Sequence, residues 1–186
     1  MKRTALVLLL AGVLAGCSDR SSDWDVAPVD PRDPELGLRG TVGLSGSAAV
    51  IDQSLDRVIL LTVPAGLSVE THPVAVGRNP SVWAASPDRR RLFVLSRGVD
   101  TPEQYVAPML SVIDGGTEPA VCRRFSLDGA YRQLAIDPQG EWVAVHDADA
   151  FVENPNELVL ARLDPDSDCG TRSEAEREGQ VINRTL

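Results

Sequence analysis

The sequence predicts an all-β domain, on the basis of three features of its central part. Its apolar runs are short and rich in Val, Ile and Leu, which suits strands of about five residues and not helices. Turn-forming residues separate the runs. The same order of runs and turns also returns along the chain, as expected for a fold made of repeated units.

The strands can be placed from the apolar runs, taken in chain order from Thr41 onward. In the turns Ser86–Asp88 and Asp137–Gly140, a Pro pre-sets the backbone angle that a tight turn needs. Ser173–Gly179 is the one segment with a helical composition, and it is short and polar. The expected strands are Ala48–Ile51, Val58–Val63, Val82–Ala85, Leu92–Leu95, Leu110–Ile113, Leu134–Ile136, Trp142–Val145 and Leu158–Leu163.

The chain repeats itself at a regular interval. Leu134–Pro138 matches Trp83–Pro87, and the strands that follow these two segments match at the same interval. Leu160–Asp164 matches Leu110–Asp114 at nearly the same interval. A repeat of roughly 40–50 residues with about four short strands is typical of a β-propeller blade.

A fainter first copy aligns Val50–Asp52 with Ala135–Asp137. The distance along the sequence from this first copy to the second is then much shorter than the distance from the second copy to the third. Residues 41–186 therefore hold about three blades of four-stranded antiparallel sheet, whereas a propeller has roughly 4 to 8 blades. We expect the chain to be the N-terminal part of a longer protein, and assembly of several copies is the alternative.

Val76–Val94 resembles the YVTN-type propeller repeat, in which Gly-x-x-Pro precedes an apolar strand, a Ser-Pro-Asp turn and a Leu-Tyr-Val strand. The resemblance extends over roughly Val74 to Asp164. It departs at Phe93, which replaces the Tyr, at the inserted Thr101–Pro108, and in the second copy, which lacks Gly-x-x-Pro. It implies a fold shared by envelope proteins, lactonases and quinoprotein-like enzymes, so the fold alone assigns no activity.

The N-terminal segment has the features of an export signal. Lys2 and Arg3 precede an apolar run that is shorter than the about 20 residues of a membrane-spanning helix. The run ends Leu-Ala-Gly-Cys17, which resembles the lipobox of bacterial lipoproteins. The resemblance implies that residues 1–16 are removed and that Cys17 carries acyl chains, so that residues 17–40, rich in Pro and Asp, form a tether. An ordinary secretory signal is the alternative.

The charge of the chain limits its partners. The net charge is −9, and removal of residues 1–16 with Lys2 and Arg3 changes it to −11. This excess of negative charge argues against nucleic acid as a partner. We expect the protein to contact the membrane through its lipid anchor in the bacterial cell envelope, at the outer membrane or the periplasmic face rather than the inner membrane. Its ligand, a protein or a small molecule, is not identified by the sequence.

Two cysteines remain after Cys17, namely Cys122 and Cys169. Export places them in a compartment that permits disulfides, and two cysteines allow a single intramolecular pair. In the repeat register both lie near the outer edges of neighbouring blades, and such edges can lie too far apart for a bridge. A Cys122–Cys169 disulfide and two separate thiols therefore both stay open.

Residues suited to catalysis are few, and no cofactor motif is present. The chain has no Gly-x-Ser-x-Gly, Walker A or His-Glu-x-x-His motif. His146, Asp147 and Asp149 form a weak candidate metal site, and the competing interpretation is a strand end followed by solvated loop acids.

The arginines and tryptophans allow two interpretations each. Arg89–Arg91 suits a solvated hairpin end or a contact with an anion. Trp83 and Trp142 suit the core between blades, with ligand stacking as the alternative.

These observations favour a non-enzymatic envelope lipoprotein that uses its propeller as a binding or interaction scaffold. A propeller hydrolase of the lactonase type is the first alternative, and it requires acids and His side chains from several blades. A structural component of a larger surface assembly is the second alternative. Whether the protein is an enzyme is left open, with a non-enzymatic role preferred.

Overall fold

A computed structural model describes residue 29 and residues 36–64, 68–116, 119–147 and 158–163. Residues 1–17, Asp149, Cys169 and Ser173–Gly179 lie outside the described residues, together with most of the expected tether. The described part contains strands, turns and bends but no helix, and therefore no helix in it is long and apolar enough to span a membrane.

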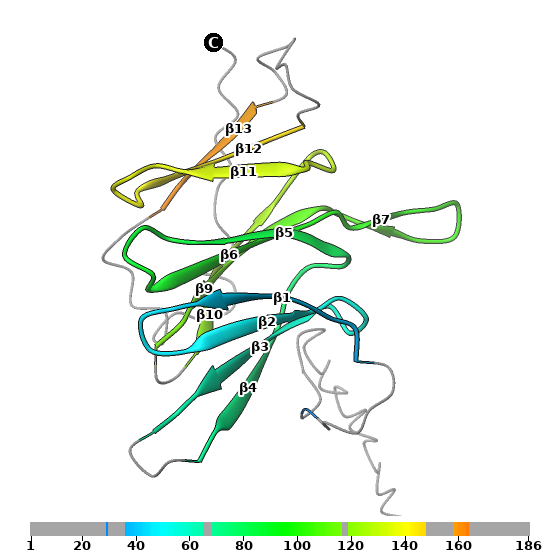
Figure 1. Cartoon of the computed structure of the whole chain (residues 1–186). Helices are drawn as coiled ribbons and strands as arrows, with labels where there is room; N and C mark the ends of the chain where they lie inside the picture. Colours follow the sequence, from blue (N-terminus) through cyan, green and yellow to red (C-terminus); the bar gives the residue numbers. More distant parts are fainter. Residues whose placement is uncertain (1–28, 30–35, 65–67, 117–118, 148–157, 164–186) are drawn as a thin grey trace, which may run out of the picture.

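The strands form three main antiparallel sheets, stacked one above another in Figure 1, and one small hairpin that projects to the right of the stack. Sheet 1 runs in the order β1 (Leu38–Gly43), β2 (Ala48–Asp52), β3 (Arg57–Thr62) and β4 (Glu70–Ala75). Sheet 2 runs in the order β5 (Pro80–Ala85), β6 (Arg91–Ser96), β9 (Met109–Asp114) and β10 (Ala120–Ser126). Sheet 3 contains β11 (Gln133–Ile136), β12 (Trp142–His146) and β13 (Leu158–Arg162). The hairpin pairs β7 (Val99–Asp100) with β8 (Tyr105–Val106).

The expected all-β fold of four-stranded antiparallel sheets is confirmed, and each of the expected strands is present with closely similar ends. Three main strands are not among the apolar runs identified in the sequence. β1 contains two Gly, β4 contains a Pro and few apolar residues, and β10 contains two Arg, so none of them forms an uninterrupted apolar run. The inserted segment Thr101–Pro108 forms part of the β7–β8 hairpin.

Two apolar clusters hold the three sheets together, as the blade interpretation requires. Burial of side chains on both faces of sheet 2 explains why Leu92–Leu95 is apolar throughout. The cluster between sheets 1 and 2 contains Ala49, Ile51, Val58, Leu60, Val74, Val76, Leu92, Val94, Ile113 and Val121. The cluster between sheets 2 and 3 contains Phe93, Leu95, Leu110, Val112, Cys122, Phe125, Leu127, Tyr131, Val143, Val145, Val159, Ala161 and Leu163.

The faint first copy of the repeat was aligned wrongly. Val50–Asp52 lies in β2, the second strand of its sheet, whereas Ala135–Ile136 lies in β11, the first strand of its sheet. The three first strands end at Gly43, Ala85 and Ile136, so both intervals are close to the length of a propeller blade. The sequence alignment made the distance between the first and second copies too short because it was displaced by one strand.

The Gly-x-x-Pro segment fixes the passage from sheet 1 to sheet 2. Gly77 lies so close to sheet 2 that an added Cβ would stand 2.8 Å from Ser96 Cβ. The carboxylate of Asp56, in the β2–β3 turn, accepts hydrogen bonds from Asn79 N at 2.8 Å and from Arg78 Nη1 at 2.9 Å. The segment therefore joins a turn of one sheet to the first strand of the next.

Candidate functional site

A shallow groove lies where the first strands of sheets 1 and 2 run side by side, and it is the candidate binding site. Its volume is about 460 Å³, within the range of small-molecule sites. One wall comes from the end of β1 and the other from the end of β5 and the turn that follows it. The lining residues are Thr41, Val42, Gly43, Ala85, Ser86, Pro87 and Arg89.

Arg89 is held in place by its backbone. Its N–H donates to Ser86 O at 2.9 Å within the turn, and its carbonyl accepts from Ser45 N of the neighbouring sheet at 2.8 Å. Its φ is +57°, in the left-handed region that side chains other than Gly rarely adopt. Gly140 occupies the equivalent position of sheet 3 in the repeat alignment, with a φ of +72°. Sheets 2 and 3 therefore share a left-handed residue in this turn, and in sheet 2 that residue is an Arg.

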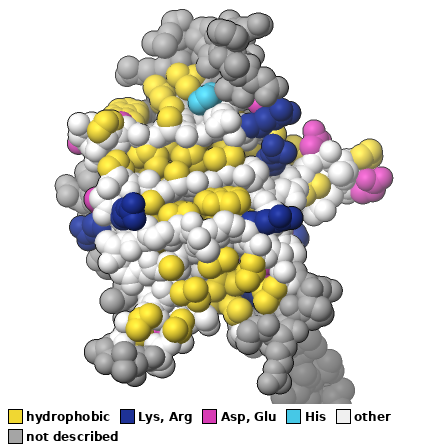
Figure 2. Space-filling model, in the orientation of Figure 1, with side chains coloured by type: hydrophobic (Ala, Val, Ile, Leu, Met, Phe, Trp, Pro, Cys, Tyr) yellow, Lys and Arg dark blue, Asp and Glu magenta, His cyan; other side chains and the backbone are white. Residues whose placement is uncertain are grey.

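The guanidinium of Arg89 extends over β1. A Cβ built on Gly43 would lie 3.7 Å from Arg89 Nη1, so the absence of a side chain at Gly43 leaves the space beside the guanidinium open. Among the described residues, this guanidinium has no carboxylate partner. Figure 2 shows Arg side chains at the edges of this face, with rows of hydrophobic side chains between them.

The turn beneath Arg89 is stabilised by Ser86 and Asp88. Ser86 Oγ donates to Asp88 Oδ1 at 2.5 Å and accepts from Arg91 N at 3.0 Å. Asp88 Oδ1 also accepts from Arg90 N at 3.0 Å. These hydrogen bonds, that from Ser86 above all, hold the pKa of Asp88 below its usual value, so the carboxylate stays ionised and directed at its own turn. The prediction that Arg89–Arg91 forms a hairpin end is confirmed.

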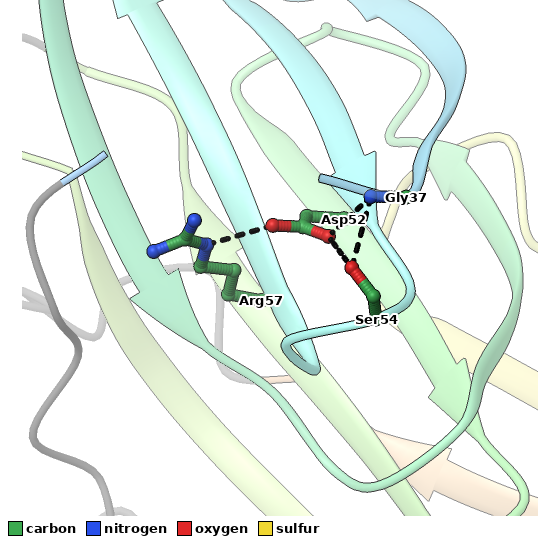
Figure 3. A network of polar contacts seen from close by, with 4 residues as sticks. All are labelled: Gly37, Asp52, Ser54 and Arg57. Atoms are coloured by element: carbon green, nitrogen blue, oxygen red, sulfur yellow. Dashed lines mark hydrogen bonds and ion pairs between the residues drawn. The ribbon is translucent and has the colours of Figure 1, made fainter. Parts of the chain in front are cut away.

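A second polar cluster, drawn in Figure 3, lies at the end of β2. Asp52 Oδ2 accepts from Arg57 Nε at 2.9 Å, and Oδ1 accepts from Ser54 Oγ at 2.8 Å and from Gly37 N at 3.2 Å. The side chains of Asp52 and Arg57 are 0% and 2% exposed. Because the hydrogen bonds close the cluster around Asp52, its arrangement indicates a structural clamp on the residues that lead into β1.

The pKa of Asp52 reflects two opposing effects. Burial raises it, and the hydrogen bonds from Ser54, Arg57 and Gly37 together with the charge of Arg57 lower it more. The net result is a pKa below the usual value, so the carboxylate is ionised at neutral pH. A buried ion pair of this kind is costly to break, because removal of one partner leaves the other charge buried alone.

The weak candidate metal site is only partly described. His146 ends β12, and Asp147 Oδ1 stands 3.4 Å from Arg132 Nε in an exposed ion pair. Asp149 lies outside the described residues. Among the residues that the structure describes, no group of three or more His, Cys, Asp or Glu side chains is placed to hold a metal ion. A metal site at His146 and Asp147 therefore stays a prediction.

The cysteines and the tryptophans complete the set of predicted site residues. Cys122 is buried between sheets 2 and 3 and takes part in a disulfide, but its partner lies outside the described residues, and pairing with Cys169 stays a prediction. Trp83 packs against the cluster between sheets 1 and 2, which confirms its core role. Trp142 instead lies on the face of sheet 3 that points away from sheet 2, with Arg162 Cζ 5.9 Å from its ring centre.

The comparisons with known proteins bear on the fold. No family model and no curated protein matches the sequence. A putative 6-phosphogluconolactonase from Bacteroides fragilis matches with a TM-score of 0.54 and 17% identity over 80% of this chain and 38% of its own. The periplasmic gluconolactonase PpgL of Pseudomonas aeruginosa matches with a TM-score of 0.54 and 20% identity over 82% of this chain and 39% of its own. A protein of unknown function from Desulfotomaculum acetoxidans gives 0.51, with 10% identity over 81% and 41%.

The three sheets are β-propeller blades. The chain spans about two fifths of the length of these solved structures. In a propeller the blades surround a central channel, and β1, β5 and β11 are the edge strands that follow one another along the stack (Figure 1). The groove at Arg89 therefore lies between corresponding strands of neighbouring blades.

Proposed function

We propose that the protein is an envelope-anchored lipoprotein whose propeller blades serve as a binding scaffold, with the groove between β1 and β5 as the binding site. The observation that carries this proposal is the Arg89 guanidinium, which lies beside an open groove without a carboxylate partner among the described residues. Small-molecule sites are concave and combine an apolar lining with a few convergent polar groups. Here Val42, Ala85 and Pro87 supply the apolar part and Arg89 the polar group.

A thermal-melt screen of the purified mature chain tests the binding role. We expect a small molecule to raise the melting temperature, because a ligand that binds only the folded state stabilises it by mass action. The Gly43→Val variant is the matched control, because its side chain occupies the space beside the Arg89 guanidinium. The proposal is wrong if no compound distinguishes the wild type from this variant across sugars, organic acids and phosphorylated metabolites.

The lipid anchor is part of the proposal and is supported by the Leu-Ala-Gly-Cys17 sequence after a positively charged and apolar segment. The periplasmic description of the Pseudomonas aeruginosa protein supports a location on the same side of the inner membrane. Several acyl chains hold a protein at a membrane much more firmly than one chain does. The Gly-x-x-Pro and Ser-Pro-Asp segments likewise support YVTN-type repeats in these blades.

Labelling of cells with a radioactive fatty acid tests the anchor. We expect label on the wild type and none on Cys17→Ala, which should accumulate as an unprocessed precursor. The Cys169→Ala variant is the control and should be labelled like the wild type. Equal labelling of the wild type and Cys17→Ala would refute the anchor without affecting the groove.

A lactonase activity is the second candidate function, since two of the solved neighbours carry that description. At 17% and 20% identity they show the fold alone. A pH-stat assay with glucono-δ-lactone separates the two candidates, because ring opening releases a proton at neutral pH. Turnover above the rate of spontaneous hydrolysis would favour the enzyme, and stabilisation by a ligand without turnover would favour the scaffold. A structural role in a surface assembly predicts neither result.

A further inference from the structure

We propose that the groove binds small molecules through an anionic oxygen group, a carboxylate or a phosphate, and that Arg89 is the cationic group that receives it. This inference rests on the proposed function, because it names the ligand chemistry of the same groove. Three observations support it: the pairing of the arginines, the backbone at Arg89 and the open space above Gly43.

Arg89 differs in its pairing from three other arginines, each of which has a carboxylate partner. Arg57 pairs with Asp52 at 2.9 Å, Arg78 with Asp56 at 2.9 Å and Arg132 with Asp147 at 3.4 Å. Among the described residues Arg89 has no such partner, and neither do Arg39, Arg90 and Arg97, but of these four only Arg89 lines the groove. A guanidinium has five donors in a planar fork that matches a carboxylate or a phosphate, and here that fork borders a groove.

The backbone at Arg89 provides an independent indication. A left-handed backbone is strained for Arg and unstrained for Gly, and the equivalent position in the next blade is Gly140. Strained residues that the surrounding structure holds in place concentrate at functional sites. Here the hydrogen bonds to Ser86 O and from Ser45 N provide that support, so the backbone from which the guanidinium extends is fixed relative to both walls.

The groove leaves room for the anion beside the guanidinium. Gly43 has no side chain there, and Thr41 is exposed with a hydroxyl that can donate a further hydrogen bond. Asp88 is the nearby opposing charge, but its carboxylate accepts from Ser86 Oγ and Arg90 N within the turn. A volume of about 460 Å³ suits a molecule the size of a monosaccharide or a small organic acid.

Nuclear magnetic resonance titration of the full mature chain tests the inference, with inorganic phosphate and acetate as separate probes at constant ionic strength. We expect saturable shifts of the Thr41, Gly43 and Arg89 amides with one or both probes, with dissociation constants of about 1–10 mM, as expected for one charge-assisted contact. The probe that saturates at the lower concentration distinguishes phosphate from carboxylate recognition.

Two variants make the result specific. Arg89→Gly removes the guanidinium and places in blade 2 the residue that blade 3 has, so it should fold and should weaken binding at least fivefold. Arg90→Ala removes an equal charge from an exposed neighbour that does not line the groove, and it should change binding less than twofold. Equal losses in the two variants, or shifts that do not saturate, would overturn the inference.

The outcomes distinguish failure of this inference from failure of the proposed function. If a neutral compound from the melt screen stabilises the wild type and Arg89→Gly equally but not Gly43→Val, the groove is a binding site and the assignment of an anionic ligand is wrong. If no compound binds in either experiment, the proposed function fails as well. An intact fold of Arg89→Gly is checked by its circular dichroism and its melting temperature.

Discussion

The indole of Trp83 in β5 lies directly against Gly40 in β1, and this contact joins the first strands of two blades. A Cβ built on Gly40 would stand only 2.6 Å from Trp83 Cζ2. Gly40 also has a φ of +51° and lies at a bulge, where the pairing of β1 with β2 shifts between Arg39 and Thr41. Both the close approach and the backbone conformation therefore require Gly at this position.

We predict that Gly40→Ala lowers the free energy of unfolding by about 2–4 kcal/mol, the combined effect of overpacking and an unfavourable backbone angle. Gly43→Ala is the matched control in the same strand, because its added Cβ would meet its nearest atom at 3.7 Å, an ordinary contact distance. Urea denaturation followed by tryptophan fluorescence measures both. If Gly40→Ala costs no more than an ordinary surface substitution, about 0.5 kcal/mol, the two strands are not in close contact.

Much of the fold could be predicted from the sequence, because the buried strands have a clear pattern. Leu92–Leu95 and Trp142–Val145 are apolar runs next to Pro-containing turns, and both were placed correctly. The edge strand β10 is absent from the apolar runs because Arg123 and Arg124 interrupt its apolar residues. Cross-strand register decides which face a side chain occupies, so the outward position of Trp142 could not be read from its run.

The candidate site was predictable only in part. Arg89–Arg91 was identified as a hairpin end or an anion contact, but the other wall of the groove comes from Thr41–Gly43, in the preceding sheet. Nothing in the sequence near Gly43 indicates that Arg89 extends over it. The repeat does contain a signal, because Arg89 aligns with Gly140. A residue other than Gly, where another copy of the repeat has a turn Gly, indicates a position with a special role.

The Asp52 clamp leads to a prediction about stability. We expect Asp52→Asn to lower the free energy of unfolding at pH 7 by about 3–5 kcal/mol, because it leaves the buried Arg57 without its counter-charge. Asp147→Asn is the control, since Asp147 and Arg132 are 50% and 51% exposed and such pairs contribute about 0–1 kcal/mol. Chemical denaturation measures both, and similar small effects would argue against a clamp.

The same clamp predicts a pH dependence with a definite sign. The folded-state pKa of Asp52 lies below its usual value, so its contribution is fully present above the unfolded pKa of about 3.9. The contribution is lost as the pH falls through the folded pKa, where the carboxylate becomes protonated. The difference in stability between the wild type and Asp52→Asn should therefore shrink below about pH 4, as acid titration of both proteins in denaturant would measure. A difference that grows with acid would contradict the assigned direction.

The disulfide of Cys122 leads to a prediction about its partner. We expect Cys122 to pair with Cys169, because the remaining cysteine, Cys17, is expected to carry the lipid. A free-thiol assay on denatured, unreduced Cys17→Ala protein should detect no thiol, and the Cys17→Ala, Cys169→Ser double variant should expose one. Two reactive thiols in the Cys17→Ala protein would show that Cys122 and Cys169 are not paired.

The outward face of blade 3 should promote self-association. Trp142, Ala144 and Leu160 share this face, because Val143, Val145 and Val159 point into the cluster with blade 2 and strand side chains alternate. All three side chains are half-buried, and apolar side chains that reach the surface together favour association. The mature chain should therefore form oligomers as its concentration rises, despite its net negative charge.

Light scattering over a range of concentrations tests this prediction, with two variants that introduce the same Glu at different positions. Leu160→Glu places a charge on the outward face and should shift the protein toward monomer without a large loss of stability, since Leu160 is only half-buried. Tyr105→Glu is the control, because Tyr105 is 69% exposed on the β7–β8 hairpin, away from that face, and it should leave association unchanged. A wild type that stays monomeric over the whole concentration range would refute the prediction.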